Sequence, residues 1–169
     1  MIDVIDLKKT FGDLEVLKGI NVTINKGDIV VVIGPSGSGK STFLRCLNCM
    51  EDPTSGSIIF NGVDIADMRV DINIHRRHMG MVFQHFNLFN NMTVIENIMM
   101  APVYVRCKEL KKAKRKGTLA PDAPKTKAEI KAQARAEALE LLRRIGLEDK
   151  ADVYPSTLSG GQKQRVAIV

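Results

Sequence analysis

The chain has 169 residues, of which 44% are hydrophobic and 26% are charged, as is typical of one folded domain rather than a disordered chain. Its net charge of +6 is local, because the segment 106–127 carries nine basic and two acidic residues and the rest is nearly neutral. The longest aliphatic run, Ile29 to Ile33, is too short to span a bilayer, and the N-terminus lacks the basic and apolar blocks of a signal peptide, so we expect a cytosolic protein.

The first 61 residues predict a strand-rich region with one helix. Alternating apolar residues predict half-buried strands, and the continuous apolar run Ile29–Ile33 is typical of a central strand covered on both faces. The pair Asn61-Gly62 predicts a tight hairpin turn. We expect strands at 1–7, 16–25, 29–33 and 57–61, a turn at 8–15 and a helix at 40–50.

A glycine-rich loop precedes this helix, and Gly34, Gly39, Lys40 and Ser41 have the spacing G-x-x-x-x-G-K-[ST]. Glycines let successive backbone N–H groups converge on an anion, and the following helix adds its positive dipole end. The lysine can reach the β- and γ-phosphates, and the serine hydroxyl can bind Mg²⁺. We therefore predict a nucleoside triphosphate site, the alternative being a glycine-rich turn that binds nothing.

Downstream of residue 61 the sequence becomes mainly helical. A short apolar strand, Met79–Phe83, is expected to stop at Gln84. Thr93 and Glu96 have the spacing of a capping box, so we predict a helix from Thr93 to about Pro102.

The basic segment 106–127 follows, and we interpret it as a mobile loop with a fraying helical edge. Its helix-breaking residues are Gly117, Pro121 and Pro124. An alanine-rich amphipathic helix is then expected at 127–145, ended by Gly146.

A second glycine turn, Ser159-Gly160-Gly161, opens the last helix. Serine is a natural N-cap, and the two glycines would leave the helix N-terminus uncovered for close approach of an anion. Considered alone, this pattern favours an ordinary capped helix start, because serine caps are common.

The cysteines and histidines suggest no metal site. Cys46 and Cys49 have C-x-x-C spacing but lie among apolar helix positions without a second cysteine pair, so we interpret them as small core residues. An odd total of three cysteines agrees with a reducing compartment. The three histidines have no acidic or cysteine ligand at suitable spacing, and we expect them at the surface: His75, His78 and His85.

These motifs together resemble the nucleotide-binding subunit of an ABC transporter. The loop Gly34 to Thr42 is similar to its Walker A motif, and Leu158 to Gln162 (LSGGQ) to its signature motif. Gln84 matches the Q-loop glutamine, and Phe11 falls where the family places an aromatic residue that stacks on adenine. The phrases MVFQHFNLF and YPSTLSGGQKQRVAI look most like the branch that imports polar amino acids.

The resemblance implies an α/β fold: a P-loop NTPase (RecA-like) core with an N-terminal antiparallel β subdomain and a helical subdomain, incomplete at the C-terminus. The implied divisions are residues 1–88 for the nucleotide-binding core, 89–160 for the helical subdomain and 161–169 for a helix returning to the core. The segment 106–127 is an insertion outside the usual family pattern.

The resemblance also implies ATP and Mg²⁺ as cofactors, with Ser41 and Gln84 at the metal. Two subunits would meet head to tail as an isologous homodimer, each closing its signature motif over the other's ATP. The implied contacts within a subunit are Phe11, Gly34, Pro35, Ser36, Gly37, Ser38, Gly39, Lys40, Ser41 and Thr42. The contacts from the other subunit are Ser159, Gly160, Gly161 and Gln162.

Membrane permease subunits are the implied partners, with a solute-binding protein acting indirectly and no nucleic acid, so the subunit would lie at the cytoplasmic face of the membrane. The Met-rich segment Phe86–Met100 would dock the permease, although helix core packing explains its methionines equally well. The insertion 106–127 is either a solvated loop or a contact for anionic headgroups.

The last carboxylate of the chain is Asp152, before the signature motif. The resemblance places an Asp that orders Mg²⁺, a Glu that polarises water and a switch histidine after that motif, so we expect a C-terminally truncated chain without catalytic residues. Its Ile29–Ile33 strand would then lack a neighbour. We favour the energy-coupling subunit of a polar amino acid importer; the alternatives are a hydrolysis-deficient nucleotide-binding module and an ATPase of DNA repair or translation.

Overall fold

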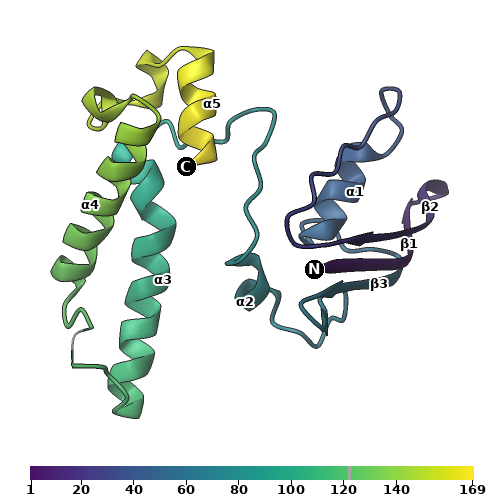
Figure 1. Ribbon diagram of the computed structural model, residues 1–169, viewed down its shortest axis with the longest axis horizontal. Helices are drawn as coiled ribbons and strands as arrows, with labels where there is room; N and C mark the ends of the chain where they lie inside the picture. Colours follow the sequence, from purple (N-terminus) through teal and green to yellow (C-terminus); the bar gives the residue numbers. More distant parts are fainter. Residues whose placement is uncertain (122) are drawn as a thin grey trace. The chain divides into compact units, whose positions relative to one another are not determined.

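The computed structural model describes residues 1–121 and 123–169, and it separates them into two compact units, Met1–Met81 and Val82–Val169 (Figure 1). The first unit contains β1 (Ile2–Phe11), β2 (Leu14–Ile24), α1 (Lys40–Leu47), β3 (Ser55–Phe60), β4 (Val63–Asp64) and α2 (Ile72–Arg76). The second contains α3 (Val94–Lys116), α4 (Lys127–Arg144), η1 (Glu148–Lys150), η2 (Pro155–Thr157) and α5 (Gly160–Ile168). None of the described helices is long and apolar enough to cross a membrane.

The first unit is built on an antiparallel sheet in the order β2-β1-β3-β4. β1 is central, pairing Val4 with Val22 on one side and with Ile58 on the other. Asn61 and Gly62, both with positive φ, make the two-residue turn between β3 and β4, which confirms the predicted hairpin. The strands β1 and β2 are longer than predicted and leave only Gly12 and Asp13 between them.

Helix α1 packs on this sheet and closes a small hydrophobic core (Figure 1). Phe43, Cys46 and Cys49 come from α1 and the residues after it. They meet Val4, Leu7, Leu17 and Ile58 of the sheet, together with Ile65. The predicted core role of the two cysteines is therefore confirmed.

The predicted strand at Ile29–Ile33 is wrong, because this segment is irregular and pairs with none of the four described strands. Its side chains are exposed, Ile29 at 95% and Ile33 at 86%. A strand is stable only when a neighbour accepts its backbone hydrogen bonds, and no part of residues 1–121 and 123–169 supplies one here. The predicted strand Met79–Phe83 is irregular for the same reason.

The second unit is a pair of adjacent helices, α3 and α4, with α5 packed at one end (Figure 1). Thr93 and Glu96 form the predicted capping box at the start of α3. The core lies at this end, where Val94 and Ile95 of α3 meet Leu142 of α4 and Val166 of α5. Thr126 caps α4, and Gly146, with φ +67°, follows its end as predicted.

Helix α3 continues to Lys116, so the prediction that it ends near Pro102 is wrong. The predicted mobile loop at 106–127 is also wrong for residues 106–116, which are helical. Proline inside a helix costs about 3 kcal/mol. Contacts with α4 offset this cost, including an ion pair of 2.5 Å between Arg106 and Glu137. Gly117, with φ +65°, then ends the helix. Asp122 of the predicted insertion lies outside the described residues.

Replacing Gly56 by alanine is expected to destabilise the first unit far more than replacing Gly62. Both glycines have positive φ, which costs an alanine about 1–2 kcal/mol. A Cβ at Gly56 would also lie 2.4 Å from the Asp6 carbonyl oxygen, whereas one at Gly62 meets nothing within 4 Å. Denaturant unfolding should place Gly56→Ala at least about 2 kcal/mol below Gly62→Ala; equal losses would contradict the close approach of β3 to β1.

Candidate functional site

The phosphate loop runs from Gly34 into the first turn of α1. Gly39 is the N-cap of this helix, with φ +88°, and no side chain caps it. The first intrahelical bond joins Phe43 N to Gly39 O at 2.8 Å. Within the described residues, the N–H groups at the start of α1 therefore have no side-chain acceptor, which leaves this end available to an anion.

Gly39 also fixes the loop against the sheet. A Cβ at this position would lie 3.0 Å from Val16 Cγ1 and 3.2 Å from Leu17 Cδ2, both on β2. Only glycine combines this backbone conformation with so close an approach. The start of α1 is thereby held against β2, an edge strand of the sheet.

The ammonium group of Lys40 is held by the loop itself. Its Nζ donates to the carbonyl oxygens of Gly34 at 2.8 Å and Pro35 at 2.7 Å, and it lies 3.4 Å from Ser38 Oγ. These acceptors are neutral, so the positive charge of Lys40 is not cancelled by a carboxylate. A cation and an uncapped helix N-terminus thus share one loop, a combination suited to binding an anion.

Phe11 is the last residue of β1, next to the tight turn, and is 45% exposed. Lys9 Nζ is 4.7 Å from the centre of its ring, a cation–π distance. The same ammonium group forms an ion pair of 2.6 Å with Glu51. The ring is therefore held in position on one side while much of its surface remains accessible.

The sequence predicted that Gln84 ends a strand. In the structure the described residues directly before it form no strand, and Gln84 lies exposed in a turn. Its neighbours explain the difference, because the preceding residues from Met79 have no strand to pair with in the described chain. Gln84 belongs to the second unit and Ser41 to the first. The pairing of these two residues at a metal stays a prediction.

Ser159 caps α5, as predicted, and its hydroxyl oxygen accepts from Gln162 N at 3.3 Å. Gln162 Oε1 in turn accepts from Ser159 N at 2.8 Å, completing a capping box. The spacing S-x-x-Q was the sequence signal for this second bond. Gly160 and Gly161 are exposed, and a methyl group added to either residue would meet nothing within 4 Å.

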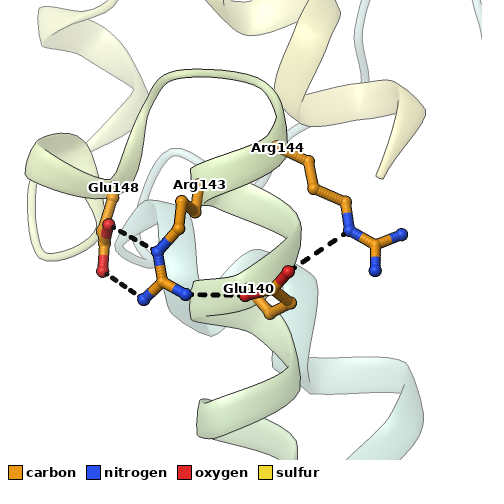
Figure 2. Close-up of polar contacts among 4 residues, drawn as sticks. All are labelled: Glu140, Arg143, Arg144 and Glu148. Atoms are coloured by element: carbon orange, nitrogen blue, oxygen red, sulfur yellow. Dashed lines mark hydrogen bonds and ion pairs between the residues drawn. The ribbon is translucent and has the colours of Figure 1, made fainter.

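An ion-pair network orders the turn between α4 and η1, upstream of α5 (Figure 2). Arg143 bonds Glu148 at 2.9 Å and Glu140 at 2.7 Å, and Arg144 adds a contact of 3.4 Å to Glu140. The hydrogen bonds from Arg143 lower the pKa of Glu148 below its ordinary value of 4.5. The contribution of this pair to stability is therefore present above about pH 4.5 and is lost as the pH falls below it.

The remaining titratable candidates are dispersed. Cys49 Sγ donates to the Ile65 carbonyl oxygen at 3.2 Å, and burial raises its pKa to about 11. His75 packs edge-on against Phe60, with ring centres 6.3 Å apart. In residues 1–121 and 123–169, no three His, Cys, Asp or Glu side chains are grouped closely enough to hold a metal ion.

The ABC transporter family profile matches residues 17–169, a span that includes the phosphate loop and the capped helix α5. The chain belongs to the ABC transporter family. Its fold is similar to two solved dimeric structures of the ATP-binding cassette MJ0796, one of them bound to ADP and phosphate, each with a TM-score of 0.75. These structures are 31% and 32% identical to this chain. Each match covers 99% of this chain and 67% of the solved chain. The α/β cassette fold expected from the sequence is thus confirmed.

Curated relatives carry names from amino acid transport. The chain is 47% identical to the glutamine transport ATP-binding protein GlnQ of Geobacillus stearothermophilus over 96% of its own length. It is 51% identical to the arginine transport ATP-binding protein ArtM of Bacillus subtilis over 99% of its length. The chain spans only 58% and 61% of these two relatives.

Thiol labelling is expected to separate the three cysteines. Cys107 is partly exposed and should react with a thiol reagent at neutral pH while the protein is folded. Cys46 and Cys49 are buried, with raised pKa values, and should react only after unfolding. Mass spectrometry of the labelled protein counts the reacted thiols; native labelling of all three would contradict the core position of α1.

Proposed function

We propose that this chain is the ATP-binding part of the energy-coupling subunit of an importer for polar amino acids. The observation that carries the proposal is the phosphate loop, in which an uncapped helix N-terminus and the Lys40 ammonium group lie together. Family membership adds weight, because the loop lies within the matched residues 17–169. In the complete protein, ATP hydrolysis would drive transport.

In this proposal the triphosphate is bound by residues 34–42. Lys40 exchanges its bonds to the loop carbonyls for bonds to phosphate oxygens, which is favourable because a charged acceptor strengthens each hydrogen bond. The free N–H groups at the start of α1 bind the same phosphates. The accessible ring of Phe11 stacks on the adenine.

Mg²⁺ would be held by the hydroxyl of Ser41 and the side-chain oxygen of Gln84, both oxygen ligands of the type that this ion prefers. When bound, the ion would offset the charge of the phosphates. Ser41 lies in the first turn of α1 and is exposed, so its hydroxyl is accessible from solvent.

A second copy of the chain would complete the site. Ser159 to Gln162 form an exposed helix start in the second unit, and we assign them to the ATP of the partner subunit in a head-to-tail homodimer. Both solved cassettes to which this chain is similar are dimeric, which supports a homodimer. We retain residues 1–88, 89–160 and 161–169 as the core, helical and returning segments.

Permease subunits at the cytoplasmic face of the membrane are the proposed partners, with a solute-binding protein acting indirectly and no nucleic acid. The names of relatives refer to transport of glutamine, arginine and general L-amino acids, which supports a polar amino acid as cargo. The proposed docking segment is Phe86–Met100, which exposes Phe89 and Met100 while Val94 and Ile95 are buried. The segment thus combines core packing with a surface for a partner.

The substitution Lys40→Ala is expected to weaken ATP binding by about 10-fold to 100-fold, because it removes a charge-assisted hydrogen bond to the phosphates. Isothermal titration with ATP and Mg²⁺ measures the change. Lys26→Ala is the matched control, since Lys26 is an exposed lysine in a turn before the loop. Equal affinities for the two variants would refute the proposed phosphate site.

A second candidate function, for these 169 residues taken by themselves, is nucleotide binding without hydrolysis. It is favoured by one observation: no Asp or Glu follows Asp152 in these 169 residues, and none therefore follows the signature motif. Phosphoryl transfer depends on groups that position water and stabilise charge. A chain that lacks them can bind ATP through residues 34–42 without cleaving it.

A polypeptide of these 169 residues is expected to bind ATP but to release no phosphate above the background of its Lys40→Ala variant. Phosphate release over time measures the turnover. Turnover that the Lys40→Ala substitution abolishes would contradict this second candidate and assign hydrolysis to residues within the chain.

A further inference from the structure

A groove between α3 and α4, with a volume of about 760 Å³, is not used by the proposed nucleotide site. Helix α3 contributes Met99, Met100, Val103, Tyr104, Lys108 and Lys111 to its lining, which recur every three or four residues and so share one helix face. Helix α4 contributes Lys127, Lys131 and Arg135 at intervals of four. The groove therefore has an apolar region next to a basic region.

The basic residues in and beside the groove differ in their partners. Arg106 pairs with Glu137 at 2.5 Å and so joins α3 to α4, whereas Lys114 donates at 2.7 Å to the Lys125 carbonyl oxygen in the segment before α4. Arg135 pairs with Asp152 at 3.1 Å. In contrast, the four lysines of the groove form no ion pair within the part of the chain that the structure describes: Lys108, Lys111, Lys127 and Lys131.

Four unpaired lysines raise the electrostatic energy of the fold unless an anionic partner offsets their charge. Among the residues that the structure describes, Glu96 is the only acidic one in the groove lining, at its apolar end. Next to the lysines, Tyr104 is 68% exposed and combines an apolar ring with a polar hydroxyl. Tyrosine of this kind is enriched at membrane–water interfaces, and lysine stems lie along apolar surfaces while their ammonium groups reach headgroups.

We propose that this face of the α3–α4 hairpin binds the surface of a bilayer that contains anionic phospholipids. The lysines contact the phosphate groups, and Tyr104 contacts the boundary between headgroups and acyl chains. Nucleic acid fits the face less well, because stacking on bases needs several aromatic side chains and the groove has one. The binding needs no nucleotide, so it can be tested independently of the proposed ATP site.

The first test measures sedimentation of the protein with vesicles of phosphatidylcholine, with or without phosphatidylglycerol, in the absence of nucleotide. The double variant Lys108→Gln/Lys111→Gln should bind the anionic vesicles about 25-fold more weakly, at about fivefold per lysine. The matched control is Lys112→Gln/Lys116→Gln, which removes two charges from the same helix outside the groove. It should weaken binding by less than about threefold; equal weakening by both pairs would overturn the proposal.

The second test uses the absence of tryptophan from the chain. Tyr104→Trp places a single fluorophore in the groove, and its emission should shift to the blue with anionic vesicles but not with phosphatidylcholine alone. Tyr154→Trp is the control, because Tyr154 is 51% exposed and does not line the groove. No shift at position 104, an equal shift at 154, or tighter binding of single-stranded RNA than of anionic vesicles would each overturn the proposal.

Discussion

The close packing of Gly39 on β2 is the contact on which the proposed nucleotide site depends. A Cβ at position 39 would lie 3.0–3.3 Å from atoms of Val16 and Leu17, which is closer than ordinary contact, so the start of α1 lies tightly against β2. The core beneath α1, with Phe43 and Cys46 against the sheet, holds the helix in the same place. Because the N-terminus of α1 is uncapped, this rigidity positions free N–H groups for a ligand instead of for the chain's own side chains.

The starts of α1 and α5 differ although both follow glycine-rich turns. Helix α1 has a glycine N-cap and a lysine held by neutral carbonyls, so its dipole end lacks a side-chain acceptor. Helix α5 has a complete capping box, in which Ser159 and Gln162 satisfy each other's backbone N–H groups. In physical terms α1 is the stronger anion site, whereas α5 is a stable helix start with exposed glycines at which a partner could approach closely.

In the hairpin of α3 and α4, the residues that stabilise the fold are different from those that carry the unpaired surface charge. Its end near α5 is held by apolar packing; farther along, Arg106 joins α3 to α4, and Lys114 joins α3 to the segment before α4. The four groove lysines add charge without such pairing among the described residues. Charge that contributes nothing to holding the fold is available for binding a partner.

Local sequence determined the features that need only neighbouring residues: the Asn61-Gly62 turn, the Thr93 and Ser159 caps, the phosphate loop and the period of α4. Tertiary structure decided the rest. Apolar content alone cannot make Ile29–Ile33 a strand, because a strand needs a neighbour for its backbone, and none is present in residues 1–121 and 123–169. Conversely, α3 passes Pro102 because packing against α4 offsets the lost hydrogen bond, a contact that no local pattern reveals.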